Sequence, residues 1–330
     1  MDTILFSRES EDYLSLLFFS VSIAVALAAQ TRPRRISNTT SKQKRSNVFK
    51  VVALDLDGTT LNTHHKITQV TVDKLRALSA QGIQISIATG RSLGAVMDTL
   101  GELQLGVEVP VVCLNGAMCI KVSKDVQSIE KVFDALVSAE SAANLLAFAA
   151  SRGLVAQYYI ESKVYAAPKT DEHHELLGRY STLTGKKQHV IPNYSEPISI
   201  APAAKILLMT TDADGLIADA TRMGLDQDFH MIKGSPYPFF VEFLAPGINK
   251  GTGLQRMCKE MQYDIAEVVA FGDGENDKEF LQYAGMGVAM HNARPLAKFA
   301  ADAINPWTND EDGVARYLDM MEKRDILCLK

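Results

Sequence analysis

The feature that most constrains the fold of this chain is a series of short apolar runs, each of which ends abruptly in small or polar residues. Between these runs lie stretches with helical periodicity, such as residues 71–81, where apolar side chains share one face and Gly82 provides a stop. Buried strands that alternate with amphipathic helices are typical of an α/β domain with a mostly parallel sheet. The sequence therefore predicts an α/β fold with a Rossmann-like, doubly wound parallel sheet as its core. Four of its strands are expected at residues 51–54, 83–88, 111–114 and 268–271.

The ends of these four strands carry groups that can contact a ligand. The polar residues concerned are Asp55, Thr89, Asn115 and, one residue further from its strand, Asp273. In an open parallel sheet, ligands bind at the carboxyl ends of the strands, near the point where the strand order reverses. If the four strands are neighbours, these side chains surround one crevice.

The sequence pattern changes between about residues 130 and 243. A helix is expected at residues 135–151, a strand pair at 155–160 and 163–166, and further strands and a helix before residue 244. This content is enough for a separate α/β layer inserted into the first domain. The predicted organisation has three parts: a segment outside the fold at 1–49, a catalytic core made of 50–129 and 244–330, and an inserted α/β cap domain at 130–243.

The first fifty residues differ from the rest. Residues 13–29 form a charge-free apolar run that ends near Ala26-Leu27-Ala28, a sequence typical of a signal-peptidase site, and residues 31–50 contain no acidic side chain. This combination is typical of a presequence for an organelle such as a plastid. Because the residues before the run are net acidic, a membrane anchor or a disordered tail is the alternative; without a presequence the chain would be cytoplasmic. No stable membrane association is expected for the catalytic part.

The charge and cysteine content exclude some classes of function. The chain has 34 Lys and Arg against 39 Asp and Glu, and the acidic excess lies after residue 49. Nucleic-acid binding requires clustered basic residues, so nucleic acid is not an expected partner. The four cysteines form no CxxC pair and no zinc-binding spacing, so a disulfide framework is not expected either. The sequence predicts no particular oligomeric state.

The sharpest chemical signal is Asp55-Leu56-Asp57-Gly58-Thr59, which follows the first expected strand without a gap. Asp55 can attack phosphorus to form an aspartyl-phosphate, while Asp57 protonates the leaving oxygen and then deprotonates the attacking water. Gly58 lets the backbone leave the strand sharply, and the amides of Leu56 and Asp57 can face phosphoryl oxygens. The alternative for an isolated pair of aspartates is a strand end that merely caps a turn.

Three further motifs follow in order: Thr89-Gly90-Arg91, Asn249-Lys250-Gly251 and Gly272-Asp273-Gly274-Glu275-Asn276-Asp277. Together with the first, they resemble motifs I to IV of the haloacid-dehalogenase-like (HAD) hydrolase superfamily. The resemblance is closest to the Cof-like branch, subfamily IIB, of sugar-phosphate phosphatases, in which a large α/β cap is inserted between motifs II and III. It extends over residues 50–325.

The resemblance also implies a role for each matching residue. Asp55 is similar to the nucleophile, Asp57 to the general acid/base, and Thr89 and Lys250 to the residues that bind the phosphoryl group and neutralise its charge. The residues for which it implies substrate contacts are Leu56, Gly90, Arg91, Asn115 and Asn276. It implies a Mg²⁺ ion, an oxygen-rich site being typical of that metal, held by Asp55, Asp57 through its backbone carbonyl, Asp273 and, in support, Asp277. Arg91 has two open interpretations: it reaches a substrate phosphate, or it pairs with a nearby acid.

The expected function is Mg²⁺-dependent hydrolysis of a small phosphate monoester through an aspartyl-phosphate. The expected partner is a small phosphorylated metabolite, by preference a sugar phosphate, with flavin mononucleotide or a similar compound as a further option. Phosphoryl transfer depends mainly on positioning and charge stabilisation, which a metal ion and a lysine around a carboxylate provide. Two alternatives are a phosphosugar mutase similar to phosphomannomutase and a non-catalytic sensor of phosphorylated ligands. The presence of both aspartates disfavours the sensor.

Overall fold

The computed structural model describes residues 48–185, 187–234 and 239–329. The predicted targeting or disordered segment therefore lies almost wholly outside the described residues. The folded core begins at Phe49, which is buried and forms an isolated bridge with Leu327. The Phe49 amide donates to the Ile326 carbonyl at 2.9 Å, and the Phe49 carbonyl accepts from the Cys328 amide at 2.8 Å. Within the described ranges, no helix is both long and apolar enough to cross a membrane.

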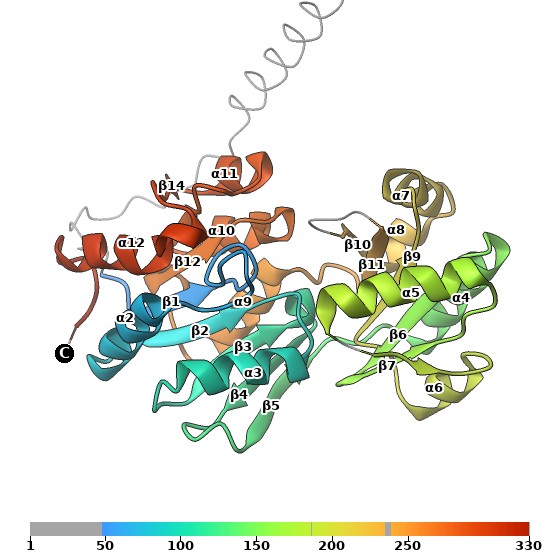
Figure 1. Cartoon of the computed structure of the whole chain (residues 1–330), viewed down its shortest axis with the longest axis horizontal. Coiled ribbons are helices and arrows are strands. Elements are labelled where there is room, and N and C mark those ends of the chain that lie inside the picture. Colours follow the sequence, from blue (N-terminus) through green and yellow to red (C-terminus); the bar gives the residue numbers. More distant parts are fainter. Residues whose placement is uncertain (1–47, 186, 235–238, 330) are drawn as a thin grey trace, which may run out of the picture. The chain divides into compact units, whose positions relative to one another are not determined.

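Eight strands form the larger sheet, in the order β14-β13-β12-β1-β2-β3-β4-β5 (Figure 1). The strands from β14 to β3 are parallel, and β4 and β5 are added in antiparallel orientation at one edge. The predicted α/β fold with a parallel core is thus confirmed. The strands are β1 (Val51–Leu54), β2 (Gln84–Ala88), β3 (Val109–Cys113), β4 (Met118–Val122), β5 (Ile129–Asp134), β12 (Val268–Gly272), β13 (Met286–Ala289) and β14 (Ala303–Ile304).

Two groups of helices pack with this sheet. The helices are α2 (Gln69–Ala80), α3 (Leu93–Leu103), α9 (Lys250–Glu260), α10 (Lys278–Tyr283), α11 (Pro295–Ala300) and α12 (Gly313–Glu322). Helix α2 contacts α3 and α12, whereas α10 contacts α9 and α11. Every residue of β1, β3 and β12 is buried, as expected for parallel strands that are covered on both faces.

The limits of α2 follow from its local sequence. The Thr68 side chain accepts a hydrogen bond from the Thr71 amide and so caps the first turn. At the other end, Gly82 has a φ of 91°, a left-handed conformation that glycine adopts without strain. The helix expected at 71–81 therefore starts two residues earlier, at its cap, and ends before the predicted glycine.

A second sheet has six strands in the order β10-β11-β9-β6-β7-β8 (Figure 1). We call this part of the chain the cap. Its strands are β6 (Ala156–Ile160), β7 (Lys163–Ala166), β8 (His189–Val190), β9 (Lys205–Met209), β10 (His230–Lys233) and β11 (Phe240–Leu244). Its helices are α4 (Ala139–Ser151), α5 (Asp171–Thr184), α6 (Ser195–Ile200), α7 (Ala213–Arg222) and α8 (Leu225–Asp228).

Strand pairing places the limits of the cap slightly later than the predicted range of 130–243. Strand β5 still pairs with β4 in the larger sheet, whereas Leu244 is the last residue of β11 in the smaller one. By this criterion the cap spans residues 135–244. The strand β5 is hard to detect from sequence because it is a charged, half-exposed edge strand, Ile-Glu-Lys-Val-Phe-Asp.

The two faces of the cap sheet have different partners. One face, which includes Tyr158, Ile206 and Phe243, belongs to a hydrophobic cluster of the cap itself. The alternate residues Tyr159 and Leu207 belong instead to the cluster that also contains the core strands. Because successive side chains of a strand point to opposite faces, the second face of the cap sheet is the one that packs with the catalytic core.

Candidate active site

Strands β12, β1, β2 and β3 are direct neighbours, which is the condition that the predicted crevice requires. Their carboxyl ends bring the four polar segments to one edge of the sheet. The Asp55 amide donates to the Phe271 carbonyl at 3.0 Å, which joins the first segment to β12. The Asn115 amide donates to the Thr89 carbonyl at 3.0 Å, which joins the second and third segments. The main chain therefore holds these segments together before any side chain contributes.

Lys250 lies between two of the predicted aspartates. It is the first residue of α9, whose start is defined by a capping box in which Asn249 and Thr252 bond each other's backbone. Its side chain is fully buried, and Nζ lies 2.7 Å from Oδ1 of Asp55 and 2.5 Å from Oδ1 of Asp277. Burial lowers the pKa of the Lys250 ammonium, but the carboxylates of Asp277 and Asp55 outweigh burial, and the pKa lies above its ordinary value. Lys250 is therefore positively charged.

Three carboxylates gather around this ammonium group in the described part of the chain. Ligand oxygens of Asp55, Asp273 and Asp277 lie within 4.8 Å of one another. Burial raises the pKa of Asp55 well above its ordinary value, although Lys250 opposes this effect. Burial and the Asp277 carboxylate raise the pKa of Asp273 to about 7, while the Thr59 hydroxyl donates to its Oδ1 at 2.9 Å. The site has more negative than positive groups, and a bound cation would correct that imbalance.

The residues present fit a divalent cation. The cluster consists of carboxylates only, and oxygen ligands are those that Mg²⁺ prefers. Gly58 makes room for Asp273, since a Cβ at Gly58 would lie 2.4 Å from Asp273 Oδ2. Asp277 is already engaged, because its Oδ1 contacts the buried ammonium and its Oδ2 accepts from the amides of Asp273 and Gly274 at 2.9 and 2.8 Å. Asp55 and Asp273 are thus the side chains that could hold the ion, and Asp277 shapes the loop beside them.

Asp57 has a different partner. The Nε of Arg91 donates to Asp57 Oδ2 at 2.7 Å, and a second guanidinium nitrogen donates to Oδ1, which makes the pair bidentate. His65 Nδ1 adds a contact at 3.4 Å. Burial raises the pKa of Asp57, but the hydrogen bonds from Arg91 outweigh burial and the net shift is downward. Of the two interpretations of Arg91, the structure shows the pairing with a nearby acid.

The remaining residues of the first two motifs that were predicted to contact a ligand offer mainly backbone groups. Thr89 is buried, and its hydroxyl accepts a hydrogen bond from the Arg91 amide at 3.2 Å. Gly90 lies against Asn115, since a Cβ at Gly90 would be 3.0 Å from Asn115 Oδ1. The Leu56 side chain is fully buried in the core. Leu56 and Gly90 can therefore contribute only main-chain groups to a ligand.

The segment after β3 has a backbone conformation that the sequence did not predict. Leu114, Asn115 and Gly116 have φ values of 53°, 54° and 102°. For a residue such as leucine this left-handed conformation costs about 1–3 kcal/mol and persists where surrounding contacts enforce it. The conformation directs the Asn115 side chain, whose Nδ2 donates to Glu242 Oε2 at 2.8 Å and whose Oδ1 accepts from Asn276 Nδ2 at 2.9 Å. Asn115 thereby connects the cap to the loop that contains the fourth motif.

Sequence reasoning missed three residues at this site: His65, Lys205 and Glu242. His65 lies in the loop after the first motif, which carries no pattern of its own. Lys205 and Glu242 are single charges in strands that are otherwise apolar, Lys-Ile-Leu-Leu-Met and Phe-Val-Glu-Phe-Leu. A charge is costly to bury without a partner, so a lone charge in an apolar strand is the signal that could have marked both residues.

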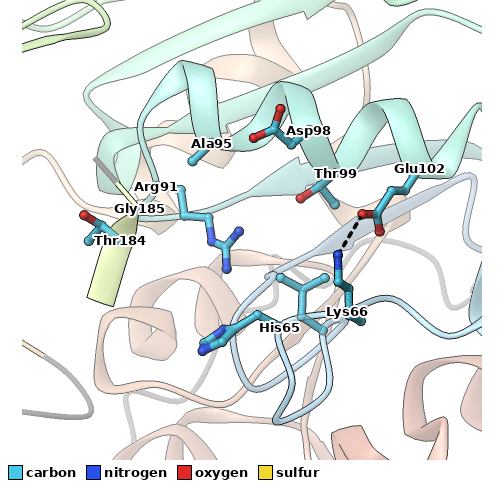
Figure 2. Close-up of a pocket in the computed structure, with 10 residues that line it drawn as sticks. His65, Lys66, Arg91, Ala95, Asp98, Thr99, Glu102, Thr184 and Gly185 are labelled. Atoms are coloured by element: carbon cyan, nitrogen blue, oxygen red, sulfur yellow. Dashed lines mark ion pairs between the residues drawn. The ribbon is translucent and has the colours of Figure 1, made fainter. Parts of the chain in front are cut away.

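A pocket of about 210 Å³ lies beside the Asp57–Arg91 pair (Figure 2). The core lines it with residues of the loop after β1 and of α3, and the cap lines it with the end of α5. Figure 2 shows the Arg91 side chain extending into the space between these elements. Lys66 and Glu102 form an ion pair of 3.6 Å across one side of it. The lining thus has charges of both signs, which suits a polar ligand.

Comparison with known proteins agrees with this geometry. Residues 52–318 match the family model of haloacid dehalogenase-like hydrolases. The phosphatase YwpJ of Bacillus subtilis is 28% identical over 294 residues, covering 82% of this chain and 99% of that protein. A haloacid dehalogenase-like hydrolase from Bacteroides thetaiotaomicron is 27% identical in sequence, with a TM-score of 0.69 over 83% of this chain and 99% of the other. The HAD subclass IIB sugar phosphatase BT4131 is 26% identical, with a TM-score of 0.66 over 84% of this chain and 100% of the other.

These matches confirm the predicted family. The family model covers most of the described residues, and all four motifs lie within it. The resemblance is therefore one of the whole fold as well as of the site, and the prediction of an enzyme is confirmed with it. The chain belongs to the haloacid dehalogenase-like hydrolase family.

Proposed function

We propose that this hydrolase is a Mg²⁺-dependent phosphatase that cleaves small phosphate monoesters through an aspartyl-phosphate on Asp55. The observation that carries the proposal is the buried carboxylate of Asp55, held at a strand end by the ammonium group of Lys250 at 2.7 Å. A buried lysine beside a nucleophilic carboxylate orients it and neutralises charge when an anionic phosphate approaches. Asp273 is the second carboxylate that would hold the metal ion, together with Asp55.

In the proposed reaction, a carboxylate oxygen of Asp55 forms a bond to phosphorus while the bond from phosphorus to the leaving oxygen breaks. Asp57 would give a proton to that oxygen, and in the second half it would take a proton from the water that attacks the aspartyl-phosphate. To give a proton, Asp57 must first be protonated and released from Arg91, whose two hydrogen bonds otherwise hold its pKa below the ordinary value. A bound Mg²⁺ ion supplies neutralisation of the phosphoryl charge. The amides of Leu56 and Asp57 and the hydroxyl of Thr89 would bind the phosphoryl oxygens.

The leaving group would occupy the pocket of Figure 2, since this pocket adjoins the Asp57–Arg91 pair. Arg91 links Asp57 to that space through two hydrogen bonds. A pocket of about 210 Å³ with charges of both signs supports a small polyhydroxylated leaving group. We therefore favour a sugar phosphate, and the likeness to a subclass IIB sugar phosphatase supports this choice.

The proposal is tested by phosphate release from a panel of sugar phosphates, flavin mononucleotide, pyridoxal phosphate, nucleotides and p-nitrophenyl phosphate. The full chain is assayed with Mg²⁺ and with EDTA. The expected result is metal-dependent release from p-nitrophenyl phosphate and from one or a few sugar phosphates. Metal-independent release, or no release from a folded protein, would contradict it; bisphosphate-dependent isomerisation of a sugar phosphate would indicate the mutase.

The proposal includes a presequence at residues 1–49 for an organelle such as a plastid. Its support is the charge-free run at 13–29 followed by an acid-free stretch at 31–50. A fluorescent protein attached to the C-terminal end of residues 1–49 should enter the organelle and lose these residues on import. Diffuse cytoplasmic fluorescence, with the fusion at its full length, would contradict this part of the proposal.

A further inference from the structure

Two charged residues of the cap, Lys205 on β9 and Glu242 on β11, are buried in strands that are otherwise apolar. Lys205 is 2% exposed and Glu242 is 6% exposed. Lys205 Nζ and Glu242 Oε1 are 2.7 Å apart. The desolvation of two such charges can exceed their mutual attraction, and an apolar pair of similar volume is often at least as stable. The stability of the cap therefore gives no sufficient reason for this pair.

Both side chains reach from the cap to the catalytic core. Glu242 Oε2 accepts a hydrogen bond from Nδ2 of Asn115 at 2.8 Å, and Lys205 Nζ lies 3.4 Å from the carbonyl oxygen of Gly90. Asn115 and Gly90 each follow a core strand at the crevice, and Gly90 is adjacent to Thr89. The ion pair thus contacts two of the core segments at the crevice, those that follow β2 and β3.

Asn115 continues this connection to the fourth motif. Its Oδ1 accepts a hydrogen bond from Asn276 Nδ2 at 2.9 Å. Asn276 is the central residue of the 3₁₀ turn η3 (Glu275–Asp277), which also contains the aspartate that contacts Lys250. A continuous series of side-chain hydrogen bonds therefore joins Lys205, Glu242, Asn115 and Asn276.

We infer that Glu242 is a positioning residue, which transmits the position of the cap to the metal-binding loop through Asn115 and Asn276. With the cap on the core, Glu242 accepts a hydrogen bond from the side-chain Nδ2 of Asn115. This bond turns the side-chain Oδ1 of Asn115 toward Asn276. Asn276 then restrains the loop that follows Asp273. Lys205 orients Glu242 through their 2.7 Å contact. When the cap moves away, Asn115 loses this acceptor, and the restraint on the loop is weakened.

The binding of a cation to the loop and the packing of the cap on the core are therefore coupled. A cation that favours the ordered loop must also favour the contact with the cap. The inference rests on the proposed function for the Mg²⁺ site and for its activity measurements; absence of Mg²⁺ binding to the unaltered chain would contradict the proposed function, whereas equal binding by the unaltered chain and the variant below would contradict the inference. The first test is the binding of Mg²⁺ itself to the metal-free full chain, measured by titration calorimetry. Because this measurement needs no turnover, it remains informative if the proposed phosphatase activity is absent.

The test variant is Glu242→Gln, which preserves the size of the side chain but replaces one carboxylate oxygen by an amide group that donates. We expect the dissociation constant for Mg²⁺ to rise by about fivefold or more, the lower end of typical coupling between two sites. A change of less than about twofold would overturn the inference. If the variant fails to fold because Lys205 has lost its partner, Lys205→Met combined with Glu242→Gln removes both charges, and the same weakening is expected.

A double-mutant cycle shows whether the hydrogen-bonded series acts as a unit. Glu242 and Asn276 each bond to Asn115. Independent effects of Glu242→Gln and Asn276→Ala would multiply in the double variant. If the series is the connection, the double variant should bind Mg²⁺ about as weakly as the weaker single variant. A product of the two separate effects would overturn the inference.

A matched control is Asp214→Asn, which breaks another lysine–carboxylate pair of the cap, Lys233–Asp214 at 2.9 Å. In this pair Asp214 is exposed and Lys233 is only partly buried, so its loss should leave Mg²⁺ binding unchanged. A comparison of the loss of kcat/KM for two substrates then separates positioning by Glu242 from recognition of the substrate by Glu242. Equal losses of kcat/KM for p-nitrophenyl phosphate and for the best sugar phosphate in the Glu242→Gln variant support positioning. A loss confined to the sugar phosphate would overturn it and assign Glu242 to recognition of the leaving group.

Discussion

The core and the cap each contain a buried lysine, and the two lysines have different surroundings. Lys250, at the start of α9, contacts Asp55 and Asp277, and the Asp273 carboxylate lies close by. Lys205, in the middle of the cap sheet, forms an ion pair with Glu242. Both ammonium groups are almost completely excluded from water. The groups around Lys250 have an excess of negative charge, whereas the pair in the cap is balanced.

This difference indicates what each lysine can do. A balanced, buried pair is complete and can serve as a structural contact between the cap and the core. An unbalanced cluster carries unfavourable repulsion that a cation relieves, so it is suited to a metal ion and a phosphate that arrive together. The predictions below test this distinction.

The largest effect is expected for Asp55→Asn in the unbalanced cluster. The amide has nearly the same shape and can still accept a hydrogen bond from Lys250, but it is a poor nucleophile. Turnover should fall by about 10³-fold or more, with little change in the melting temperature. The measurement is Mg²⁺-dependent phosphate release from the best substrate of the panel. Turnover near that of the natural chain would contradict the role of Asp55.

The second prediction compares the two lysines directly. Lys250→Met leaves two buried carboxylates without their ammonium group, which should destabilise the metal-free protein by about 3–5 kcal/mol. Lys205→Met leaves one carboxylate, which still accepts from Asn115, so the loss should be smaller. Urea unfolding at pH 7 in EDTA measures both free energies. Equal losses would show that the charge imbalance does not govern the stability of the core site.

The third prediction concerns pH. The pKa of Asp273 is raised to about 7 in the folded protein, against an ordinary value of 3.8. Between these values the folded state binds more protons than the unfolded state, so stability should fall as the pH rises from about 4 to 7. The melting temperature in EDTA should therefore decrease over this range, and Mg²⁺ should reverse the decrease. In Asp273→Asn the pH slope should be smaller but should not vanish, because burial also raises the pKa of Asp55 above its ordinary value. The effect of Mg²⁺ should be much smaller, and an unchanged pH slope would contradict the assignment.

The smallest effect on stability is expected for the Asp57–Arg91 pair, which is partly exposed. Arg91→Lys removes the bidentate geometry but keeps the charge. Because partly exposed ion pairs contribute little, the free energy of unfolding should change by less than about 1 kcal/mol. A much larger loss in urea unfolding would place this pair with the buried ones.

Much of the core and its chemistry could be predicted because the informative residues are close together in sequence. Asp55 and Asp57 share one short segment after a buried strand, and the period of apolar residues reveals that strand. The partners of Arg91, by contrast, could not be decided: the bidentate contact with Asp57 spans 34 positions of the chain. Nor could the left-handed backbone at Leu114, since leucine has no preference for that conformation.

The sequence by itself determined the α/β class, the four motifs and the chemical groups available, because hydrophobic period and motif spacing are local properties of the chain. Only the tertiary structure decided that Lys205 and Glu242 reach the crevice, because the contact from Glu242 to Asn115 spans 127 positions of the chain. It also decided that Asp277 is occupied by Lys250 and two backbone amides. Such contacts depend on which strands become neighbours and on how the cap packs against the core. Both follow from the free energy of the whole fold, which no short segment contains.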